Sequence, residues 1–431
     1  MATTICLQLS YPRPAVSALP KVAAFQIICF PHEEQHAMPD SKCVLLLIES
    51  SRAYSRGCLA GVASYVRAHP NWRVVHLERS LGEGGTSPLR RWGANGVVAR
   101  VETTQMVRTV SRLKLPTVHL RSVHRPQPGC LLETDHQVCA RLAADHFRQH
   151  RFRHFAFCGY PGVSFSDQRC ASFVEHVSAH GHTVNVFEPL HVAAEGDDLI
   201  SREARGELPN TQLVQWLRSL TRPVAVFACN DVRGRQLLTA CLRAGLSVPD
   251  DVAVLGVDND EVICDLSAPP LSSVEPDTKR IGYEGAALLD RLMAGESPPE
   301  EAILIPPKGV HIRQSTDVVA LEDRDVVTAL RYIRDHACDG ITVDDVAQQM
   351  AISRATLDRR FQRALERSPK TEIDRIRVNR AKRLLVETDY KIAAIATMTG
   401  YGMAPQFVTA FKRLTGFTPG KYREGAIRNT S

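Results

Sequence analysis

The pattern of apolar residues changes once along this chain of 431 residues, and that change constrains the fold more than any other feature. Between residues 41 and 313, short apolar runs alternate with segments of helical spacing, whereas every periodic segment after Val326 is helical. Short apolar runs are typical of strands buried on both faces, and their alternation with helices predicts parallel sheets covered by helices. We therefore predict an α/β domain of two doubly wound lobes with a ligand cleft between them, followed by an all-α domain.

The two domains have predictable boundaries. We assign residues 41–313 to a two-lobed effector domain, 314–324 to a polar linker, 325–425 to the helical domain and 426–431 to a short tail. Residues 1–40 contain five prolines and no clear periodicity, which predicts a disordered extension or a misplaced start codon, with Met38 as a natural start.

Only Lys21 precedes the apolar stretch that follows it, so a secretory signal peptide is not indicated. No apolar run approaches the roughly 20 residues that a membrane span needs, so we expect no membrane partner.

The net charge of +6 lies entirely in the last quarter of the chain. Residues 322–431 hold 20 Lys and Arg against 14 Asp and Glu, and the remainder of the chain is neutral. A basic domain attached to a neutral body favours a polyanionic partner, although a well-solvated domain would show the same charge.

The cysteines and the short motifs argue against a secreted protein, a metal site and an enzyme. Twelve cysteines are scattered without a C-x-x-C pair, which is typical of reduced, buried thiols in the cytoplasm. The segment 32–36 spells H-E-x-x-H, but Pro31 and Pro39 restrict it to a turn or two, so we interpret the match as chance. No P-loop and no G-x-S-x-G motif occurs. We expect no cofactor and no catalytic residues.

The helical domain contains two segments that share one plan. Residues 341–365 and 391–416 each hold a helix, a short break and a second helix, which Ser353 caps in the first unit and Pro405 opens in the second. Phe361 and Phe411 occupy matching points of the two units, 50 residues apart in the sequence. The second helix of such a unit can enter the major groove of DNA. The sequence therefore predicts a double helix-turn-helix whose units enter adjacent segments of the groove.

This domain resembles the AraC/XylS family of transcription regulators over essentially all of residues 322–425. The match rests on ITVDDVAQQMAISRATLDRRF and on IAAIATMTGYGMAPQFVTAFKRLTGFTPGKYR. The resemblance implies that the first reading helix exposes Arg354, Ala355, Asp358 and Arg359, and that the second exposes Ala404, Pro405, Gln406 and Thr409. Arg359 suits guanine and Gln406 suits adenine, while Arg360 and Lys412 suit phosphates or a solvated face. Ala404 and Pro405 stand where the family often has polar residues, so we expect the first unit to read DNA more strongly.

The effector domain resembles the LacI/GalR effector domain, which is itself similar to periplasmic sugar-binding proteins. The stretch 248–296, VPDDVAVLGVDND and onward, carries this match, but the helix-turn-helix that the family has at its N-terminus is absent. A DNA reader at the other end resembles regulators of bacterial xylose operons. That resemblance implies an activator with a pentose effector, D-xylose first, in a homodimer that acts on the nucleoid with RNA polymerase as a further partner.

Sugar recognition needs carboxylates, amides, Arg donors and an aromatic ring, and such groups gather at the carboxyl ends of parallel strands. The resemblance implies Asp258, Asp231 and Arg169 as the central contacts, with Phe165 stacking on the sugar. Asn230 and Tyr54 also follow strands and complete the predicted site, and Asp135 is a weaker candidate. Helix N-capping by Asp258 and Asp231 and core packing by Phe165 stay open as alternatives. Another sugar or sugar acid, or a sensory protein that never touches DNA, also stays open.

Overall fold

The computed structural model describes residues 41–76, 92–101, 103–122, 130–189, 199, 203, 211–317 and 323–430. The prediction for residues 1–40 and the H-E-x-x-H segment lie outside these ranges. No helix among the described residues is long and apolar enough to cross a membrane. The described residues also contain no group of three or more His, Cys, Asp or Glu side chains that would hold a metal ion.

The first lobe is built on a six-stranded sheet with the order β11-β5-β4-β3-β1-β2. All of its strand pairs are parallel, as the unbroken apolar runs predict. Its strands are β1 (Lys42–Leu47), β2 (Trp72–His76), β3 (Gly96–Val101), β4 (Thr117–Ser122), β5 (Cys130–Thr134) and β11 (Ile303–Ile305).

The second lobe repeats this plan with the order β12-β10-β9-β8-β6-β7. Its pairs are parallel except that β12 runs antiparallel to β10. Its strands are β6 (His154–Cys158), β7 (Val184–Val186), β8 (Val224–Ala228), β9 (Val252–Val257), β10 (Ser272–Glu275) and β12 (Gly309–His311).

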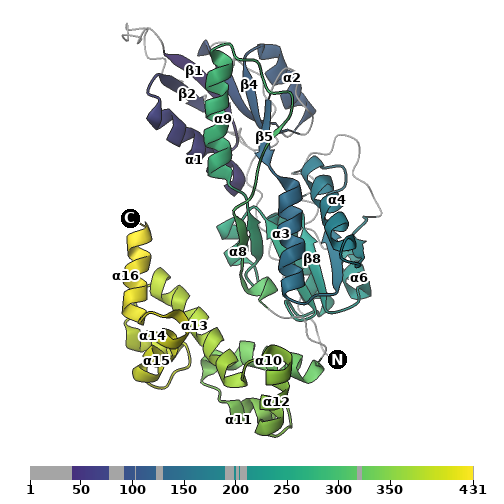
Figure 1. Cartoon of the computed structure of the whole chain (residues 1–431), viewed down its shortest axis with the longest axis vertical. Coiled ribbons are helices and arrows are strands. Elements are labelled where there is room, and N and C mark those ends of the chain that lie inside the picture. Colours follow the sequence, from purple (N-terminus) through teal and green to yellow (C-terminus); the bar gives the residue numbers. More distant parts are fainter. Residues whose placement is uncertain are drawn as a thin grey trace, which may run out of the picture. The chain divides into compact units, whose positions relative to one another are not determined.

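Helices cover both sheets (Figure 1). The first lobe holds α1 (Ala53–Ala68), α2 (Thr104–Leu113) and α9 (Thr278–Met293), and the second holds α3 (His136–Gln149), α4 (Ser164–Ser178), α6 (Thr211–Ser219), α7 (Asp231–Ala244) and α8 (Glu261–Leu266). The chain enters the second lobe after β5, returns to the first for α9 and β11, and crosses again to β12. The two predicted lobes are therefore confirmed, but neither is continuous in sequence.

The effector domain runs slightly further than the predicted boundary at residue 313. A 3₁₀ turn, η2 (Gln314–Thr316), follows β12, and the side chains of Ser315 and Thr316 are fully buried in the second lobe. Ser315 donates to the carbonyl oxygen of Val254 in β9 at 2.6 Å. The polar composition of this segment reflects buried hydrogen bonds, so the first part of the predicted linker belongs to the lobe.

The C-terminal domain is all helical, as predicted. Its helices are α10 (Arg324–His336), η3 (Ala337–Asp339), α11 (Val343–Gln349), α12 (Arg354–Leu365), α13 (Pro369–Glu387), α14 (Ile392–Met398), α15 (Ala404–Thr415) and α16 (Pro419–Thr430). One apolar cluster forms around Phe361 and a second around Phe407 and Phe411, so each helix-turn-helix unit has its own core. The segment that we predicted to be a tail, 426–431, is the end of α16 through Thr430.

Candidate functional site

Five of the six residues predicted to bind a ligand lie just beyond the carboxyl ends of parallel strands, and the sixth lies one turn into α4. Tyr54 begins α1 after β1, Phe165 and Arg169 lie in α4 after β6, and Asn230, Asp231 and Asp258 follow β8 and β9. In a doubly wound fold this edge of the sheet is where ligands bind. All except Asp258 are buried, and Asp258 is partly buried.

Asp258 differs from the other predicted site residues in its backbone conformation and in the surroundings of its carboxylate. Its backbone is in the left-handed half of conformational space, with φ of 116°, and its N–H donates to the carbonyl oxygen of Val274 at 3.0 Å. No hydrogen bond from a described residue reaches its side chain. Burial raises the pKa of Asp258, and the guanidinium groups of Arg169 and Arg121 act in the opposite direction.

Phe165 packs in the apolar core of the second lobe, as the alternative interpretation expected, and it also contacts cationic and imidazole groups. The guanidinium carbon of Arg121 is 3.9 Å from the Phe165 ring centroid, and that of Arg169 is 5.1 Å away. The ring of His136 lies 6.4 Å from the Phe165 ring. Arg169 donates from Nη1 to the carbonyl oxygen of Cys229. Cation–π contacts of this kind hold the Phe165 ring in place and leave N–H donors of the guanidinium groups available for hydrogen bonds.

Several buried nitrogen atoms in this region have no hydrogen-bond partner among the described residues. They are Nε of Arg169, which is a donor, and both ring nitrogens of His136, whose Nε2 is 3.7 Å from the Glu133 carboxylate. Burial lowers the pKa of His136 to about 4, so the ring is neutral near pH 7. Buried polar atoms are normally paired, so these unpaired nitrogen atoms beside the Phe165 ring are available to a further polar partner.

The first lobe contributes a second polar cluster. Arg100 pairs with Glu49 and donates to Ser55 at 2.6 Å, and both partners of the ion pair are almost fully buried. The guanidinium of Arg100 lies 5.3 Å from the ring centroid of Tyr54. The Tyr54 hydroxyl forms a hydrogen bond with Thr134 at 3.1 Å. Tyr54 is therefore held in place by groups from two strands, β3 and β5.

Asn230 and Asp231 have side chains that are already occupied. Asn230 caps α7 by accepting from the N–H of Arg233 at 2.9 Å, and it donates to Glu203 at 2.9 Å. Asp231 accepts from the N–H of Asp260 at 2.8 Å and from the hydroxyl of Ser273 at 2.6 Å. In this structure both residues hold neighbouring segments of the second lobe. Neither Asp231 nor Asp258 is a helix cap, because Asn230 caps α7 and Asp260 caps α8.

Reasoning from the sequence missed four residues near the predicted site: Arg52, Glu203, His136 and Arg121. Glu203 accepts from Arg52, which lies in the first lobe, and the N–H of Ala53 lies 3.4 Å from the Asp260 carboxylate. His136 and Arg121 complete the group around Phe165. The position of His136 directly after β5 and Asp135 was the available signal. Asp135 itself, the weaker candidate, caps α3 by accepting from the N–H of Val138 at 3.0 Å.

In the first helix-turn-helix unit, the predicted reading residues lie on α12 but differ in their freedom. Arg354 donates to Asp344 at 3.1 Å and lies 3.9 Å from Asp358, and Arg360 pairs with Asp323 and Asp325. Arg359 and Ala355 are exposed, and no described residue forms a hydrogen bond or ion pair with the Arg359 side chain. Arg359 is therefore free to contact DNA, and Arg363 in the last turn of α12 is exposed and without such a partner among the described residues as well.

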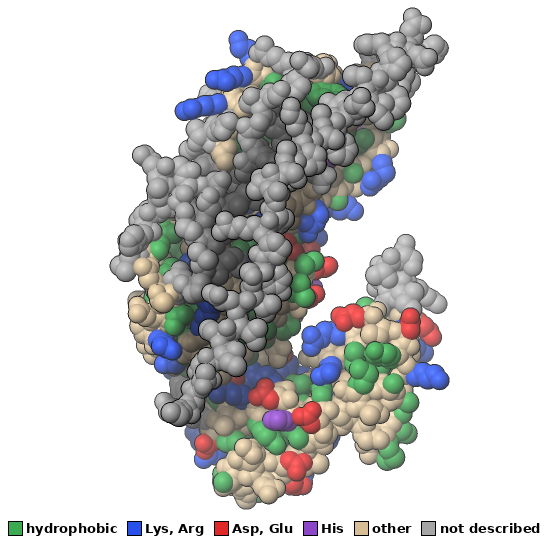
Figure 2. Space-filling view, turned by 180° about the vertical axis from the view of Figure 1, so that it is seen from behind, with side chains coloured by type: hydrophobic (Ala, Val, Ile, Leu, Met, Phe, Trp, Pro, Cys, Tyr) green, Lys and Arg blue, Asp and Glu red, His purple; other side chains and the backbone are tan. Residues whose placement is uncertain are grey.

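In the second unit, Pro405 lies in the first turn of α15, and Pro405, Gln406, Thr409 and Lys412 are all exposed. Thr409 donates its hydroxyl to the carbonyl oxygen of Pro405 at 2.9 Å. The long helix α13 joins the units, and its buried Asp374 accepts from Arg413 at 2.7 Å. Figure 2 shows Lys and Arg side chains beside Asp and Glu side chains on the helical domain, in the lower part of the view.

A two-lobed domain with buried polar groups at the carboxyl ends of its strands, joined to two helix-turn-helix units, defines the class of ligand-controlled DNA-binding regulators. The sequence model of a periplasmic binding protein-like domain matches residues 144–316, and that of a helix-turn-helix domain matches residues 346–425. The chain is 30% identical to the xylose operon regulatory protein of Escherichia coli K12 over 388 residues, which cover 88% of this chain and 96% of that protein. It therefore belongs to the family of xylose operon regulatory proteins.

Two further comparisons agree with this membership. The xylose operon regulatory protein of Haemophilus influenzae is 29% identical over 88% of this chain and 97% of its own length. The solved structure of the xylose-binding transcription activator xylR superposes with a TM-score of 0.72 at 29% identity, covering 90% of this chain and 98% of that one. These relatives are transcription regulators, which are not enzymes. The chain is a DNA-binding regulator with a helix-turn-helix domain of the AraC type.

Proposed function

We propose that this protein is a transcription activator that binds D-xylose in the cleft between its two lobes. The observation that carries the proposal is the free Asp258 carboxylate, which lies in the same region as the unsatisfied donors of Arg169 and His136 and the ring of Phe165. A pentose presents hydroxyl groups to such donors and acceptors and an apolar C–H face to an aromatic ring. The names of the relatives favour D-xylose among the pentoses.

In this proposal Asp258 accepts from sugar hydroxyls, Arg169 donates to sugar oxygens and Phe165 stacks on the ring. Tyr54 lines the first lobe, and Asn230 and Asp231 hold the loops that shape the second. The contacts across the two lobes from Arg52 and Ala53 favour a closed form that bound sugar would stabilise. A ligand shifts such an equilibrium by its difference in affinity for the two forms.

On DNA, we propose that Arg359 and Gln406 read base edges and that Arg360 and Lys412 lie near phosphates. Arg354, Ala355, Asp358, Pro405 and Thr409 lie on the same two helices and would face the groove. The pairing of Arg360 with two aspartates supports a secondary role for it, because those ion pairs must open before it contacts a phosphate. The protein would act in the cytoplasm, on the nucleoid, with RNA polymerase as its partner at the promoter.

We also propose that the protein works as a homodimer. Val262 and Leu266, four residues apart on α8, are 62% and 82% exposed, which is unusual for large apolar side chains that lie close together. Sedimentation of Leu266→Glu tests this surface. We expect a dimer for the wild type and a monomer for the variant, and a dimer in both cases would remove α8 from the interface.

Calorimetric titration of the full chain tests the choice of sugar. D-xylose, L-arabinose, D-ribose and D-glucuronate are titrated in turn into the folded protein. We expect D-xylose to bind at least about tenfold more tightly than the others, because one misplaced hydroxyl leaves a buried partner unpaired. Tighter binding of another sugar would change the effector and keep the regulator. Binding of none by a folded protein would contradict the proposed site.

A further inference from the structure

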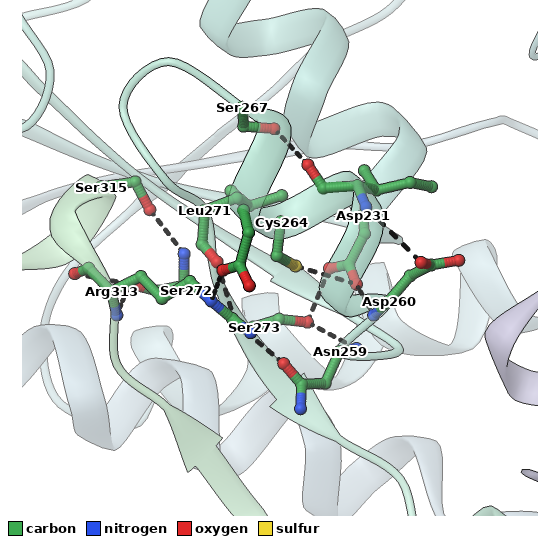
Figure 3. Close-up of polar contacts among 12 residues, drawn as sticks. Asp231, Asn259, Asp260, Cys264, Ser267, Leu271, Ser272, Ser273, Arg313 and Ser315 are labelled. Atoms are coloured by element: carbon green, nitrogen blue, oxygen red, sulfur yellow. Dashed lines mark hydrogen bonds and ion pairs between the residues drawn. The ribbon is translucent and has the colours of Figure 1, made fainter. Parts of the chain in front are cut away.

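The turn that carries Asp258 is fixed on one side by Asp231. After β9 the chain places Asp258 and Asn259 at positive φ, 116° and 46°, before Asp260 caps α8. Besides the N–H of Asp260, the Asp231 carboxylate accepts from Ser273, whose hydroxyl oxygen in turn accepts from the N–H of Asn259 at 3.0 Å. Two successive residues of the turn therefore depend on one buried carboxylate (Figure 3).

On the other side, the turn is held by Arg313, which follows β12. Its Nη1 donates to the Asn259 side-chain oxygen at 2.8 Å and to the carbonyl oxygen of Leu271 at 3.2 Å. Its Nε donates to Asp265 at the end of α8 at 2.7 Å. The Arg313 side chain is 11% exposed, so its bonds to Asn259 and Leu271 are partly shielded from water, whereas its partner Asp265 is 64% exposed. Arg313 thus joins both ends of the segment that begins with Asp258 and ends with α8.

The backbone of Arg313 is the start of the connection to the DNA-binding domain. Its N–H donates to the Ser272 hydroxyl at 2.8 Å, and that hydroxyl donates back to the Arg313 carbonyl oxygen at 3.0 Å. Thr316 donates to the same hydroxyl at 2.8 Å, and Ser315 accepts from the N–H of Ser272 at 2.8 Å. The next residue, Asp317, accepts from Arg375 of α13 at 2.8 Å.

We propose that Arg313 is a positioning residue that transmits sugar occupancy from the Asp258–Asp260 turn to the segment 313–317, and so to the DNA-binding domain. The proposal rests on the proposed sugar site. A sugar that donates to Asp258 moves the turn, and Asn259 moves with it because the two residues are adjacent in a strained backbone. Arg313 moves with Asn259 because the two side chains are hydrogen-bonded, and Arg313 is the first residue of the segment 313–317. A buried, continuous network of hydrogen bonds is a physical route for such coupling.

The test measures coupling separately from each binding reaction. A labelled duplex of the region upstream of the protein's own gene is titrated with the full chain, with and without saturating D-xylose, and the ratio of the two dissociation constants is the coupling factor. Ratios of about 5 to 150 are typical of allosteric proteins. For Arg313→Gln we expect this factor to fall at least fivefold toward 1. Sugar affinity by calorimetry and DNA affinity without sugar should each change less than about threefold.

Two variants keep the result interpretable. Arg280→Gln removes an exposed arginine that pairs with Glu284 outside this network, and it should leave the coupling factor unchanged. Arg313→Lys keeps the charge but cannot reach Asn259 and Asp265 together, so it should give an intermediate factor, and it replaces Arg313→Gln if that variant does not fold. An unchanged factor in the folded variant, or a loss of sugar binding itself, overturns the proposal. If the wild type binds none of the sugars, the proposed function, on which this inference rests, is contradicted instead.

Discussion

Asp258 has a strained backbone conformation and a partly buried carboxylate. Both features lower the stability of the folded protein, and both are compatible with a residue whose role is to bind a ligand. A non-glycine residue at φ of 116° costs on the order of 1–3 kcal/mol. Burial also raises the pKa of its carboxyl group. Neither term contributes to stability, so the side chain is expected to matter for ligand binding far more than for folding.

The variant Asp258→Asn tests this separation. We expect D-xylose affinity to fall about 10- to 150-fold, because a hydrogen bond to a charged group is worth about 1.5–3 kcal/mol. The melting temperature should stay the same or rise, since a buried charge has been removed. Calorimetry and thermal unfolding measure the two effects, with the exposed Glu261→Gln as control. Equal sugar affinity in Asp258→Asn and wild type would exclude Asp258 as a ligand contact.

Three buried histidines predict how stability depends on pH. Burial lowers the pKa of His119 and His136 to about 4 and that of His146 to about 3, from an ordinary value of 6.5. The unfolded chain therefore binds protons at a higher pH than the folded one, so stability is complete above pH 6.5 and is lost as the pH falls toward 4. Each histidine contributes on the order of 3 kcal/mol to this loss.

Urea unfolding between pH 7 and pH 4.5 measures this dependence. We expect the free energy of unfolding to fall steadily, and His119→Gln should reduce the slope. The exposed His180→Gln should leave the slope as it is. A free energy that stays constant from pH 6.5 to pH 5 would show that these rings are not buried in neutral form.

The sequence located the ligand residues by type and strand, but not the role of each one. Asp231 and Asp258 both follow apolar strands, and only the folded structure distinguishes them. Asp231 begins α7 and accepts a hydrogen bond from Ser273 of β10, whereas no described residue donates to the Asp258 side chain. Such partners come from distant positions in the chain, 42 residues away for Ser273. The same holds for Arg52 and Glu203, which no local pattern joins.

At the scale of elements, α1 and α9 pack unusually closely. A Cβ atom on Gly282 would overlap the carbonyl oxygen of Cys58, and one on Gly61 would overlap that of Lys279. Nothing in the sequence indicates that α9, which begins more than 200 residues after α1 ends, returns to cover it. The glycines at the contact are the only sequence feature related to this packing, and their role can be recognised only after the two helices are known to be neighbours.

We expect Gly282→Ala to destabilise the protein by about 1–3 kcal/mol, because the helices must separate to admit a methyl group. Chemical unfolding followed by circular dichroism measures the change. Gly425→Ala, at a position in α16 with no atom near the added Cβ, serves as control and should not destabilise. If Gly282→Ala is as stable as the wild type, the close contact between α1 and α9 is not required.

The two reading helices lead to different expectations on DNA. Arg359→Ala should cost about 1–3 kcal/mol of affinity and relax specificity at one base pair, because its side chain is free to donate to a base. Lys412→Ala should weaken binding to all sequences and reduce the salt dependence by about one counterion. Fluorescence anisotropy on a set of single-base variants of the DNA site separates the two effects. Uniform weakening by Arg359→Ala would assign it to a phosphate instead.

At the scale of the whole molecule, the order of the domains is what the sequence established best. The change from alternating to purely helical patterns predicted both domains, and the family comparison confirmed their combination. The connection between them was less predictable, because the polar segment at 314–317 looks like a linker, yet its Ser315 and Thr316 are buried in the second lobe.

The central claim is that sugar in the cleft controls DNA binding, and one titration tests it most directly. The labelled upstream region is titrated with the full chain at fixed salt concentration, with and without D-xylose. We predict at least about fivefold tighter binding with the sugar, together with a marked loss of affinity as salt is raised. The same affinity with and without D-xylose, L-arabinose and D-ribose would contradict the account.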